Sequence, residues 1–218
     1  MSHDVVSNKD YWDEFYKKDV LSVPSQFCAM VSTEAPKDRA IIEFGCGNGR
    51  DSLYFASQRF RVSATDLSHQ AIESCQELAD DLDLRGVTFQ QGDLSQPHDI
   101  NSIVETGRNL TKTGKVTGYS RFVMHSINDD QEAMFLSNVS GALKEGELFY
   151  LEFRSKEDAD LNKIYGNHYR RFVDTDMFVK SMTDTYGFEL LYRLTGQGMA
   201  KYKNEDPFVS RLIFEKQA

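Results

Sequence analysis

Apolar residues occur along the chain in short runs that are separated by longer amphipathic stretches. The short runs read as buried strands, because most of them end next to Gly, Asp or Asn. The predicted strands cover residues 40–44, 61–65, 87–91, 118–127 and 146–153. The range 118–127 includes the residues that follow the end of the fourth strand. The predicted helices cover residues 24–33, 50–58, 68–82 and 129–143. Strands that alternate with helices predict a parallel sheet with helices on both faces.

The C-terminal part adds a helix over residues 174–186, with Asp174 or Thr175 as its cap, and two further strands. These strands, residues 188–195 and 208–215, are predicted to pair antiparallel at one edge of the sheet. The polar connection over residues 95–117 is expected to hold only a short helix around Ile100–Glu105. The predicted fold is therefore α/β and Rossmann-like, with a doubly wound, mostly parallel sheet of seven strands and an antiparallel C-terminal hairpin.

Two segments outside the predicted core have patterns of their own. Residues 8–18 place Trp12, Phe15 and Tyr16 at helical spacing, which predicts an amphipathic helix. Its aromatic residues either dock a terminal helix on the body of the protein or form a lid over an active site, and the two roles are compatible. Residues 155–167 form a long polar connection, and connections of this length in compact domains are often functional.

Length, composition and charge narrow the class of protein. A chain of 218 residues with 40% hydrophobic residues is expected to form one domain with a substantial core. It has no apolar run that could span a bilayer, and Met1–Asp4 do not begin a signal peptide. Three cysteines without metal-ligand spacing predict free thiols, a cytoplasmic location and no metal site. A net charge of −9 disfavours nucleic acid as a partner.

The strongest motif is the run of alternating glycines Gly45, Gly47 and Gly49, which joins the first strand to the helix over residues 50–58. Glycines allow tight turns and close approach to a ligand, and the N–H groups at the start of a helix bind polar ligands. The dinucleotide pattern G-x-G-x-x-G requires a glycine where this chain has Arg50. The spacing therefore argues against an NAD-linked oxidoreductase.

An acidic residue follows the second predicted strand. Asp66 lies 21 residues after Gly45, where an acid at the tip of the neighbouring strand can accept hydrogen bonds from ribose hydroxyls. Asp66 could instead cap the following helix, although Ser68 serves that role equally well. The glycine loop favours the ribose role.

The pattern E-x-G-x-G-x-G over residues 43–49 resembles motif I of the class I S-adenosylmethionine (SAM) methyltransferases. The resemblance implies that SAM is the cofactor, that Glu43 and the glycine loop hold its methionine part, and that Asp66 binds its ribose. It also implies that the acid and N–H group after the third strand face adenine; the alternative is a surface turn. The implied cofactor-binding residues are Glu43, Gly45, Cys46, Asn48, Gly47, Gly49, Asp66, Leu67, Asp93 and Leu94. Cys46 is interpreted as a small residue beside the cofactor, not as a nucleophile.

The resemblance implies a helical cap over residues 1–38, a SAM-binding core over residues 39–153 and a substrate side over residues 154–218. His125, at the exit of the fourth strand, is a candidate proton acceptor or substrate hydrogen-bond donor, or a structural histidine. His168 is a second candidate base. The candidate substrate-binding residues are Arg121, Arg154, Tyr169, Arg170, Arg171, Tyr11 and Trp12. The arginines either bind an anionic group or neutralise the nearby acids Asp158, Asp160, Asp174 and Asp176.

Three segments, residues 119–127, 151–155 and 168–172, are similar to methyltransferases of bacterial surface-polysaccharide systems. These include enzymes that cap O-antigen chains by methylating a terminal phosphate. The resemblance implies in-line O-methylation of a small-molecule or glycan-end acceptor through a phosphate, carboxylate or hydroxyl oxygen. The alternatives are a small-molecule N-methyltransferase and a non-catalytic partner subunit with the same fold.

Overall fold

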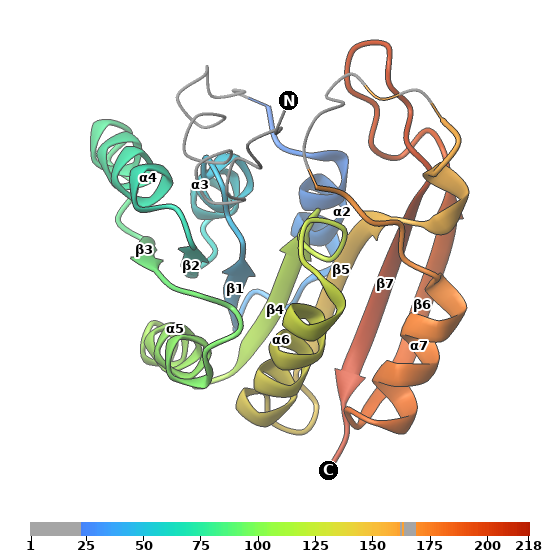
Figure 1. Cartoon of the computed structure of the whole chain (residues 1–218). Coiled ribbons are helices and arrows are strands. Elements are labelled where there is room, and N and C mark those ends of the chain that lie inside the picture. Colours follow the sequence, from blue (N-terminus) through green and yellow to red (C-terminus); the bar gives the residue numbers. More distant parts are fainter. Residues whose placement is uncertain (1–22, 162, 164–168) are drawn as a thin grey trace, which may run out of the picture.

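Seven strands form a single sheet in the order β3-β2-β1-β4-β5-β7-β6 (Figure 1). The structure is a computed structural model that describes residues 23–161, 163 and 169–218. The strands are β1 (Ala40–Phe44), β2 (Val62–Asp66), β3 (Val87–Gln91), β4 (Val116–Arg121), β5 (Leu148–Arg154), β6 (Phe188–Gly196) and β7 (Val209–Lys216). The first five are parallel, whereas β7 runs antiparallel to both β5 and β6. The predicted fold, including the antiparallel hairpin, is confirmed.

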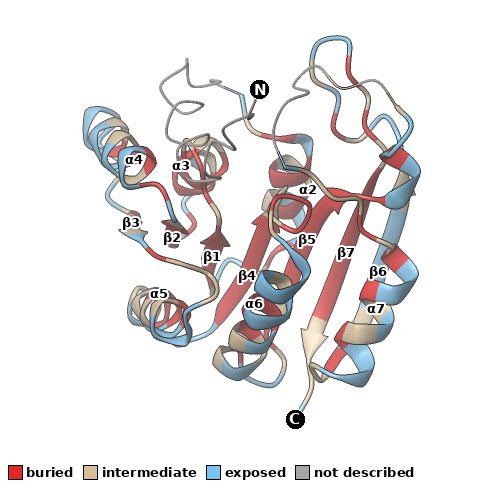
Figure 2. Ribbon diagram, in the orientation of Figure 1, coloured by how far each residue is buried: buried red, intermediate tan, exposed pale blue. Residues whose placement is uncertain are grey.

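Helices cover both faces of this sheet, and two separate cores result (Figure 2). The helices are α2 (Gln26–Glu34), α3 (Arg50–Ser57), α4 (His69–Asp81), α5 (Pro97–Asn109), α6 (Asp129–Ala142) and α7 (Thr175–Asp184), with a short 3-10 helix at Lys156–Asp158. Neighbouring residues of β1 point to opposite faces. Ile42 accordingly packs with α5, α6 and α7, whereas Ile41 packs with α2, α3 and α4. Both side chains are fully buried.

The helix α5 is longer than the sequence predicted. It spans Pro97–Asn109, whereas the expected helix covered only Ile100–Glu105. Pro97 occupies the first turn, where a proline is tolerated. Gly107 lets α5 approach β1 so closely that an added Cβ would overlap the Cδ1 of Ile42. The polar residues of this segment thus make the helix hard to recognise in the sequence, and packing against the sheet stabilises it.

Other boundaries agree with the prediction to within a few residues. The helix predicted from Pro24 begins instead at Gln26, because Ser25 is the N-cap and accepts a hydrogen bond from the backbone N of Cys28. Asp174 caps α7 and Ser68 caps α4. The helix predicted over residues 8–18 lies outside the described residues. None of the helices in the described part of the chain is both long and apolar enough to cross a membrane.

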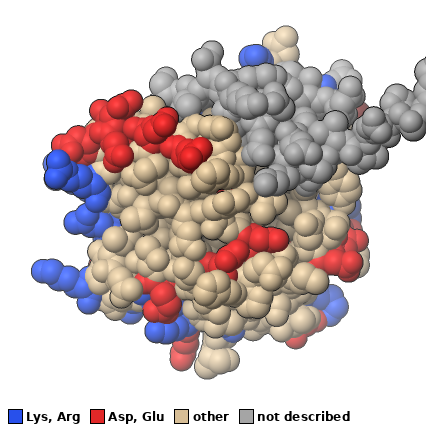
Figure 3. Space-filling view, turned by 60° about the vertical axis from the view of Figure 1, so that its left-hand side comes forward, with Lys and Arg blue, Asp and Glu red and all other residues tan. Residues whose placement is uncertain are grey.

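Charged side chains are distributed unevenly over the face that carries α4 and β3. In Figure 3, neutral side chains cover most of this face, and the side chains of Lys and Arg lie in small groups at its margin. An extended basic surface is absent among the side chains described on this face. The expectation that nucleic acid is not a partner stays a prediction.

Candidate functional site

The candidate site lies at one edge of the sheet, where the parallel strands β1 to β5 end (Figure 1). Residues 45–49 follow β1, Asp66 ends β2, and residues 92–94 follow β3. The exit of β4, residues 122–127, lies beside the glycine loop. In a doubly wound sheet, the strand order reverses between β1 and β4, and the crevice at this point is where such folds bind ligands.

The glycine loop needs its three glycines for backbone conformation and for space. Gly45, Gly47 and Gly49 have φ angles of +78°, +55° and +71°, which lie in the left-handed region. A Cβ at Gly45 would overlap the Cγ2 of Val123, and a Cβ at Gly49 would lie 2.6 Å from the Sγ of Cys75. Gly49 also precedes the first turn of α3. The loop is therefore a backbone cradle at a helix N-terminus, which fits the methionine part of SAM.

Asp66 fixes the conformation of this cradle. Its Oδ2 accepts a hydrogen bond from the backbone N of Gly47 at 2.8 Å, and its Oδ1 accepts one from the N of Ser68 at 3.0 Å. Ser68 caps α4 through its own hydroxyl, which accepts from the N of Ala71 at 3.2 Å. Leu67, beside Asp66, is exposed. Asp66 is thus a half-buried carboxylate between two loops, and its ribose role stays a prediction.

Asp93 lies in a tight turn after β3. Its Oδ1 accepts hydrogen bonds from the N and the Oγ of Ser95, both at 2.8 Å. Its own N–H donates to the Oδ2 of Asp99 at 2.8 Å. Leu94 packs against the core on the α6 side, and its carbonyl accepts a hydrogen bond from the amide of Asn138. The proposed contacts of Asp93 and Leu94 with adenine stay predictions.

Glu43 lies beneath the glycine loop, where it is 3% exposed. The Oγ of Ser52 donates a hydrogen bond to its carboxyl group. The neighbouring carboxylate of Asp51 accepts hydrogen bonds from the N and the Oγ of Ser25 and from the hydroxyl of Tyr119, at 2.8, 2.6 and 2.7 Å. Glu43 and Asp51 thus form part of a buried polar network between α2, α3 and β4.

The pKa values of the two carboxyl groups of this network are shifted in opposite directions. Burial raises the pKa of Glu43 well above its usual range, and the charge of Asp51 raises it further. Burial would also raise the pKa of Asp51, but Arg121, Arg50 and the hydrogen bonds from Ser25 hold that pKa below its usual value. Glu43 is therefore the group that keeps its proton, and its predicted role beside the methionine part of SAM stays a prediction.

The raised pKa of Glu43 predicts a specific dependence of stability on pH. Above pH 4.5, the ordinary pKa of this group, the unfolded chain loses the proton that the folded protein keeps. The contribution of Glu43 to the free energy of unfolding therefore falls as the pH rises, by up to about 1.4 kcal/mol per pH unit. We expect Glu43→Gln to remove this fall, as measured by urea unfolding between about pH 5 and 8. Parallel pH curves for the variant and the wild type would contradict the assignment, and exposed Glu189→Gln is the control.

Cys46 has the environment of a structural thiol. It is buried, and the neighbouring thiol of Cys75 together with burial keeps the pKa of Cys46 well above its usual range. A protonated, buried thiol is a poor nucleophile. This environment agrees with the interpretation of Cys46 as a small residue in the loop. Asn48 is half-buried, and its Oδ1 lies 3.4 Å from the N of Arg50.

Three of the four candidate anion-binding arginines are paired with carboxylates. Arg121 donates to Glu152 at 2.8 Å, and Arg154 donates to Asp158 at 2.7 Å and to Glu205. Arg171 donates to Asp129 and to Glu132. Of the acids that the sequence suggested as partners, only Asp158 pairs with one of these arginines. Their charges are balanced within the protein, and the predicted anion-binding role is untested.

His125 joins three segments at the exit of β4. Its Nδ1 accepts a hydrogen bond from the backbone N of Arg154 at 3.3 Å, and its carbonyl accepts one from the N of Arg171 at 3.0 Å. The ring packs edge-on against Phe122, and the residue is 4% exposed. An acceptor at Nδ1 places the proton of the neutral imidazole on Nε2. In this form the ring can donate a hydrogen bond through Nε2, and the predicted role of His125 toward the substrate stays a prediction.

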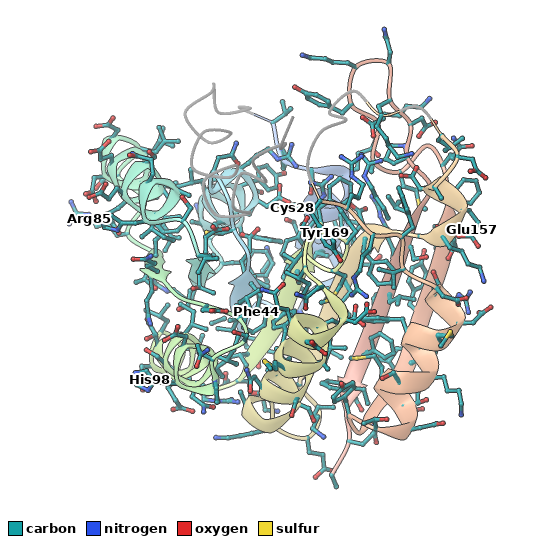
Figure 4. All side chains as sticks on the ribbon, in the orientation of Figure 1. Cys28, Phe44, Arg85, His98, Glu157 and Tyr169 are labelled. Carbon is teal, nitrogen blue, oxygen red and sulfur yellow. The ribbon has the colours of Figure 1, made fainter. Side chains whose placement is uncertain are left out.

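The remaining candidates divide between the same edge and the part of the chain that is not described. Figure 4 shows Tyr169 by the upper end of β4, away from the labelled Glu157, and its side chain is half exposed. Arg170 follows it and is half-buried. The candidates Tyr11, Trp12 and His168 lie outside the described residues. Within the described residues, no group of three or more His, Cys, Asp or Glu side chains is placed to hold a metal ion.

Two features at this edge could not be predicted from the sequence. Phe122 has a φ of +62°, which is unusual for an aromatic residue, and its ring lies 4.0 Å from the guanidinium carbon of Arg121. Arg211, which belongs to β7, donates a hydrogen bond of 2.7 Å to Glu152 of β5. Arg121 donates to the same carboxylate from β4, on the other side of β5. Both features depend on contacts between distant segments. Only the antiparallel placement of β7 beside β5 could have suggested the second.

Comparison with known proteins identifies relatives of this fold. Residues 41–146 match the family model of a methyltransferase domain. No curated protein matches the sequence. A solved SAM-dependent methyltransferase from Anabaena variabilis ATCC 29413 is similar, with a TM-score of 0.74 and 19% identity over 98% of this chain and 96% of that chain.

Two further solved structures have related folds and different chemistry. The glycopeptide N-methyltransferase MtfA has a TM-score of 0.67 and 14% identity, with coverage of 89% of this chain and 96% of that chain. It has also been solved with SAM and with S-adenosyl-L-homocysteine. The [4+2]-cyclase SpnF has a TM-score of 0.67 and 12% identity, with coverage of 92% and 85%. At these identities the likeness shows the fold alone.

Proposed function

We propose that this chain is a SAM-dependent methyltransferase that transfers a methyl group from SAM to a small acceptor, because residues 41–146 match the family model of a methyltransferase domain and the fold is similar to that of a solved SAM-dependent methyltransferase. The observation that carries the proposal is the glycine loop, whose left-handed backbone meets Asp66 through the N–H of Gly47. The cradle and Asp66, the acid that we propose to bind ribose, thus lie together at the edge where such folds bind ligands. We retain the division into a core over residues 39–153 and a substrate side over residues 154–218.

Several residues would hold the cofactor in this proposal. The backbone of the glycine loop, residues 45–49, would lie against its methionine part, Asp66 would accept from its ribose, and Asp93 and Leu94 would face its adenine. SAM, when bound, supplies an electrophilic methyl group on a sulfonium. The acceptor atom must then lie in line with the methyl carbon and the sulfur. Most of the contribution of the chain is therefore positioning and exclusion of water.

We propose an oxygen acceptor of anionic or sugar type, on the basis of the similarity of residues 119–127, 151–155 and 168–172 to polysaccharide methyltransferases. An anionic oxygen is already nucleophilic and needs no base. In the neutral form described above, His125 would donate a hydrogen bond to the acceptor. A sugar hydroxyl would therefore have to give its proton to His168, the second candidate base. N-methylation of a small molecule is the alternative. A second alternative is a partner subunit without its own turnover, since the fold also supports a cyclase and does not fix the chemistry.

The test combines binding with transfer. Calorimetry with SAM, S-adenosylhomocysteine and NAD should show binding of the first two only. Labelled SAM is then supplied with a short mannoside, the same mannoside with a terminal phosphate, and an amino sugar. Label on the phosphorylated or plain mannoside would support O-methylation, and label on the amino sugar but on neither mannoside would support N-methylation. SAM binding without label on any acceptor would favour the partner-subunit alternative, and NAD binding would contradict the proposal.

A further inference from the structure

The connection between β6 and β7 lies at the same edge of the sheet as the glycine loop. We call residues 197–208 the β6–β7 loop; Figure 1 shows it at the upper end of the sheet, beyond the ends of β5 and β6. The register of the antiparallel pair places Val209, the first residue of β7, opposite Arg154, the last residue of β5. The loop therefore begins and ends beside the predicted substrate side of the site.

Buried charges hold this loop in place. Arg154 donates to Asp158 at 2.7 Å through Nη1 and to Glu205 of the loop through Nη2. The three side chains are 8%, 0% and 6% exposed. Asp158 also accepts a hydrogen bond from the N of Phe208 at 2.8 Å, and Arg211 donates to the carbonyl of Met199 at 2.7 Å. The β6–β7 loop is thus anchored near its start, near its tip and at its end.

The cluster of Arg154, Asp158 and Glu205 contributes more to the position of the β6–β7 loop than to the stability of the protein. Burying an ion pair costs a desolvation energy that its attraction roughly offsets, so such pairs are weak evidence of net stabilisation. Here they join the end of β5, the 3-10 helix and the β6–β7 loop, which are far apart in the sequence. The geometry points to a fixed wall rather than a freely moving connection.

A continuous path of contacts leads from the glycine loop to this wall. Val123 lies against Gly45, and the neighbouring Phe122 is held at a φ of +62°. The ring of Phe122 lies 4.0 Å from the guanidinium carbon of Arg121 and 5.6 Å from that of Arg154. A left-handed conformation is unfavourable for an aromatic residue and persists where the surroundings fix it. Arg154 then connects the path to the β6–β7 loop.

The tip of the β6–β7 loop carries two exposed lysines. Two backbone hydrogen bonds of 2.9 Å between Tyr202 and Glu205 close a tight turn, in which Lys203 has a φ of +52°. Lys203 is exposed and pairs with no acid among the described residues. Lys201 is 63% exposed and forms a long ion pair with Asp206, in which the Nζ lies 3.8 Å from the Oδ2. By contrast, Arg121, Arg154 and Arg171 are all occupied by carboxylates.

From these observations we propose that the β6–β7 loop selects the acceptor, and that Lys201 and Lys203 at its tip bind an anionic group of the acceptor. This inference rests on the proposed methyltransferase function, since it assigns part of that site. The buried arginines shape the wall, and the two exposed lysines supply the charge. Lysine is suited to this role because its ammonium group is a mobile point charge on a flexible stem.

The test uses the mannoside with and without a terminal phosphate as probes of the protein saturated with S-adenosylhomocysteine. The variant Lys201→Gln/Lys203→Gln should weaken binding of the phosphorylated mannoside about tenfold or more, because charge-assisted hydrogen bonds are lost. Binding of the plain mannoside and of S-adenosylhomocysteine should not change. The matched control is Lys112→Gln/Lys115→Gln, two exposed lysines before β4 at the opposite edge of the sheet, which should have no effect.

The outcomes separate this inference from the proposed function. Equal affinity of the wild type and the loop variant for the phosphorylated mannoside would overturn the inference, as would equal weakening in the control. Failure of S-adenosylhomocysteine to bind the wild type would instead count against the proposed function. Glu205→Gln gives a second test: trypsin should cleave after Lys201 and Lys203 several-fold faster than in the wild type, with unchanged affinity for S-adenosylhomocysteine. Unchanged cleavage would overturn the positioning role of Glu205.

Discussion

Replacing Asp66 with alanine is expected to weaken SAM binding by at least about 100-fold. Two hydrogen bonds from ribose hydroxyls to a carboxylate contribute about 1.5–3 kcal/mol each, and each 1.4 kcal/mol corresponds to about tenfold in affinity. The substitution also leaves the N–H of Gly47 without its acceptor at the centre of the glycine loop. Calorimetric titration of the variant with SAM and with S-adenosylhomocysteine measures the effect.

Two controls separate the ribose contact from local structure. Ser68→Ala removes the cap of α4, which costs about 1 kcal/mol of stability, and should leave SAM affinity unchanged. Asp66→Asn keeps an oxygen and should lose less affinity than alanine. If Asp66→Ala bound SAM as well as the wild type does, the ribose assignment would be wrong.

Replacing Glu147 with alanine is expected to lower the free energy of unfolding by about 3–5 kcal/mol. Glu147 accepts from the Nη2 of Arg108 at 2.8 Å and from the backbone N of Val116 and of Lys144 at 3.0 and 2.8 Å. Both charged side chains are almost fully buried at the edge of the sheet opposite the site. The variant leaves the guanidinium of Arg108 buried with only the exposed Glu105, 3.2 Å from its Nε, as a carboxylate partner. Urea unfolding at neutral pH measures the loss.

The size of this effect depends on burial, and two further variants test that dependence. The double variant Arg108→Met/Glu147→Leu removes both charges and should lose less stability than either single variant. Arg85→Ala breaks a pair with Asp83 that is 88% and 78% exposed, and it should cost no more than about 1 kcal/mol. A loss for Glu147→Ala as small as that for Arg85→Ala would contradict the argument.

Local patterns explain why the main elements were predictable. The strands β1 and β3 have the same limits in the sequence and in the structure. All five residues of β1 are buried and four of them are apolar, whereas the apolar residues of β3, Val87 and Phe89, alternate with polar ones and the strand ends before Gly92. The position of Asp66 relative to Gly45 follows from the length of one strand–helix–strand unit. By contrast, α5 was predicted too short, because its polar surface hides the few residues that pack on the sheet.

The partners of charged residues were the least predictable part of the site. Arg154 pairs with Asp158, four residues along the chain, but also with Glu205, which is remote in the sequence. Arg121 and Arg211 share the carboxylate of Glu152 because β4 and β7 lie on either side of β5. Such pairs depend on strand order and register, which no local pattern contains. From the sequence alone, these arginines could therefore be interpreted as ligand-binding residues. In the folded sheet, carboxylates lie beside them.

The sequence by itself determined the class of fold, the place of the glycine loop and the acid that meets it. These features depend on residue type and on spacings within about 20 residues, which backbone geometry converts directly into structure. Only the tertiary structure decided which charges are neutralised, which carboxyl group keeps its proton, and where Phe122 is forced into a left-handed conformation. Desolvation and ion pairing depend on what surrounds a group in space, and that environment exists only once distant segments have packed together.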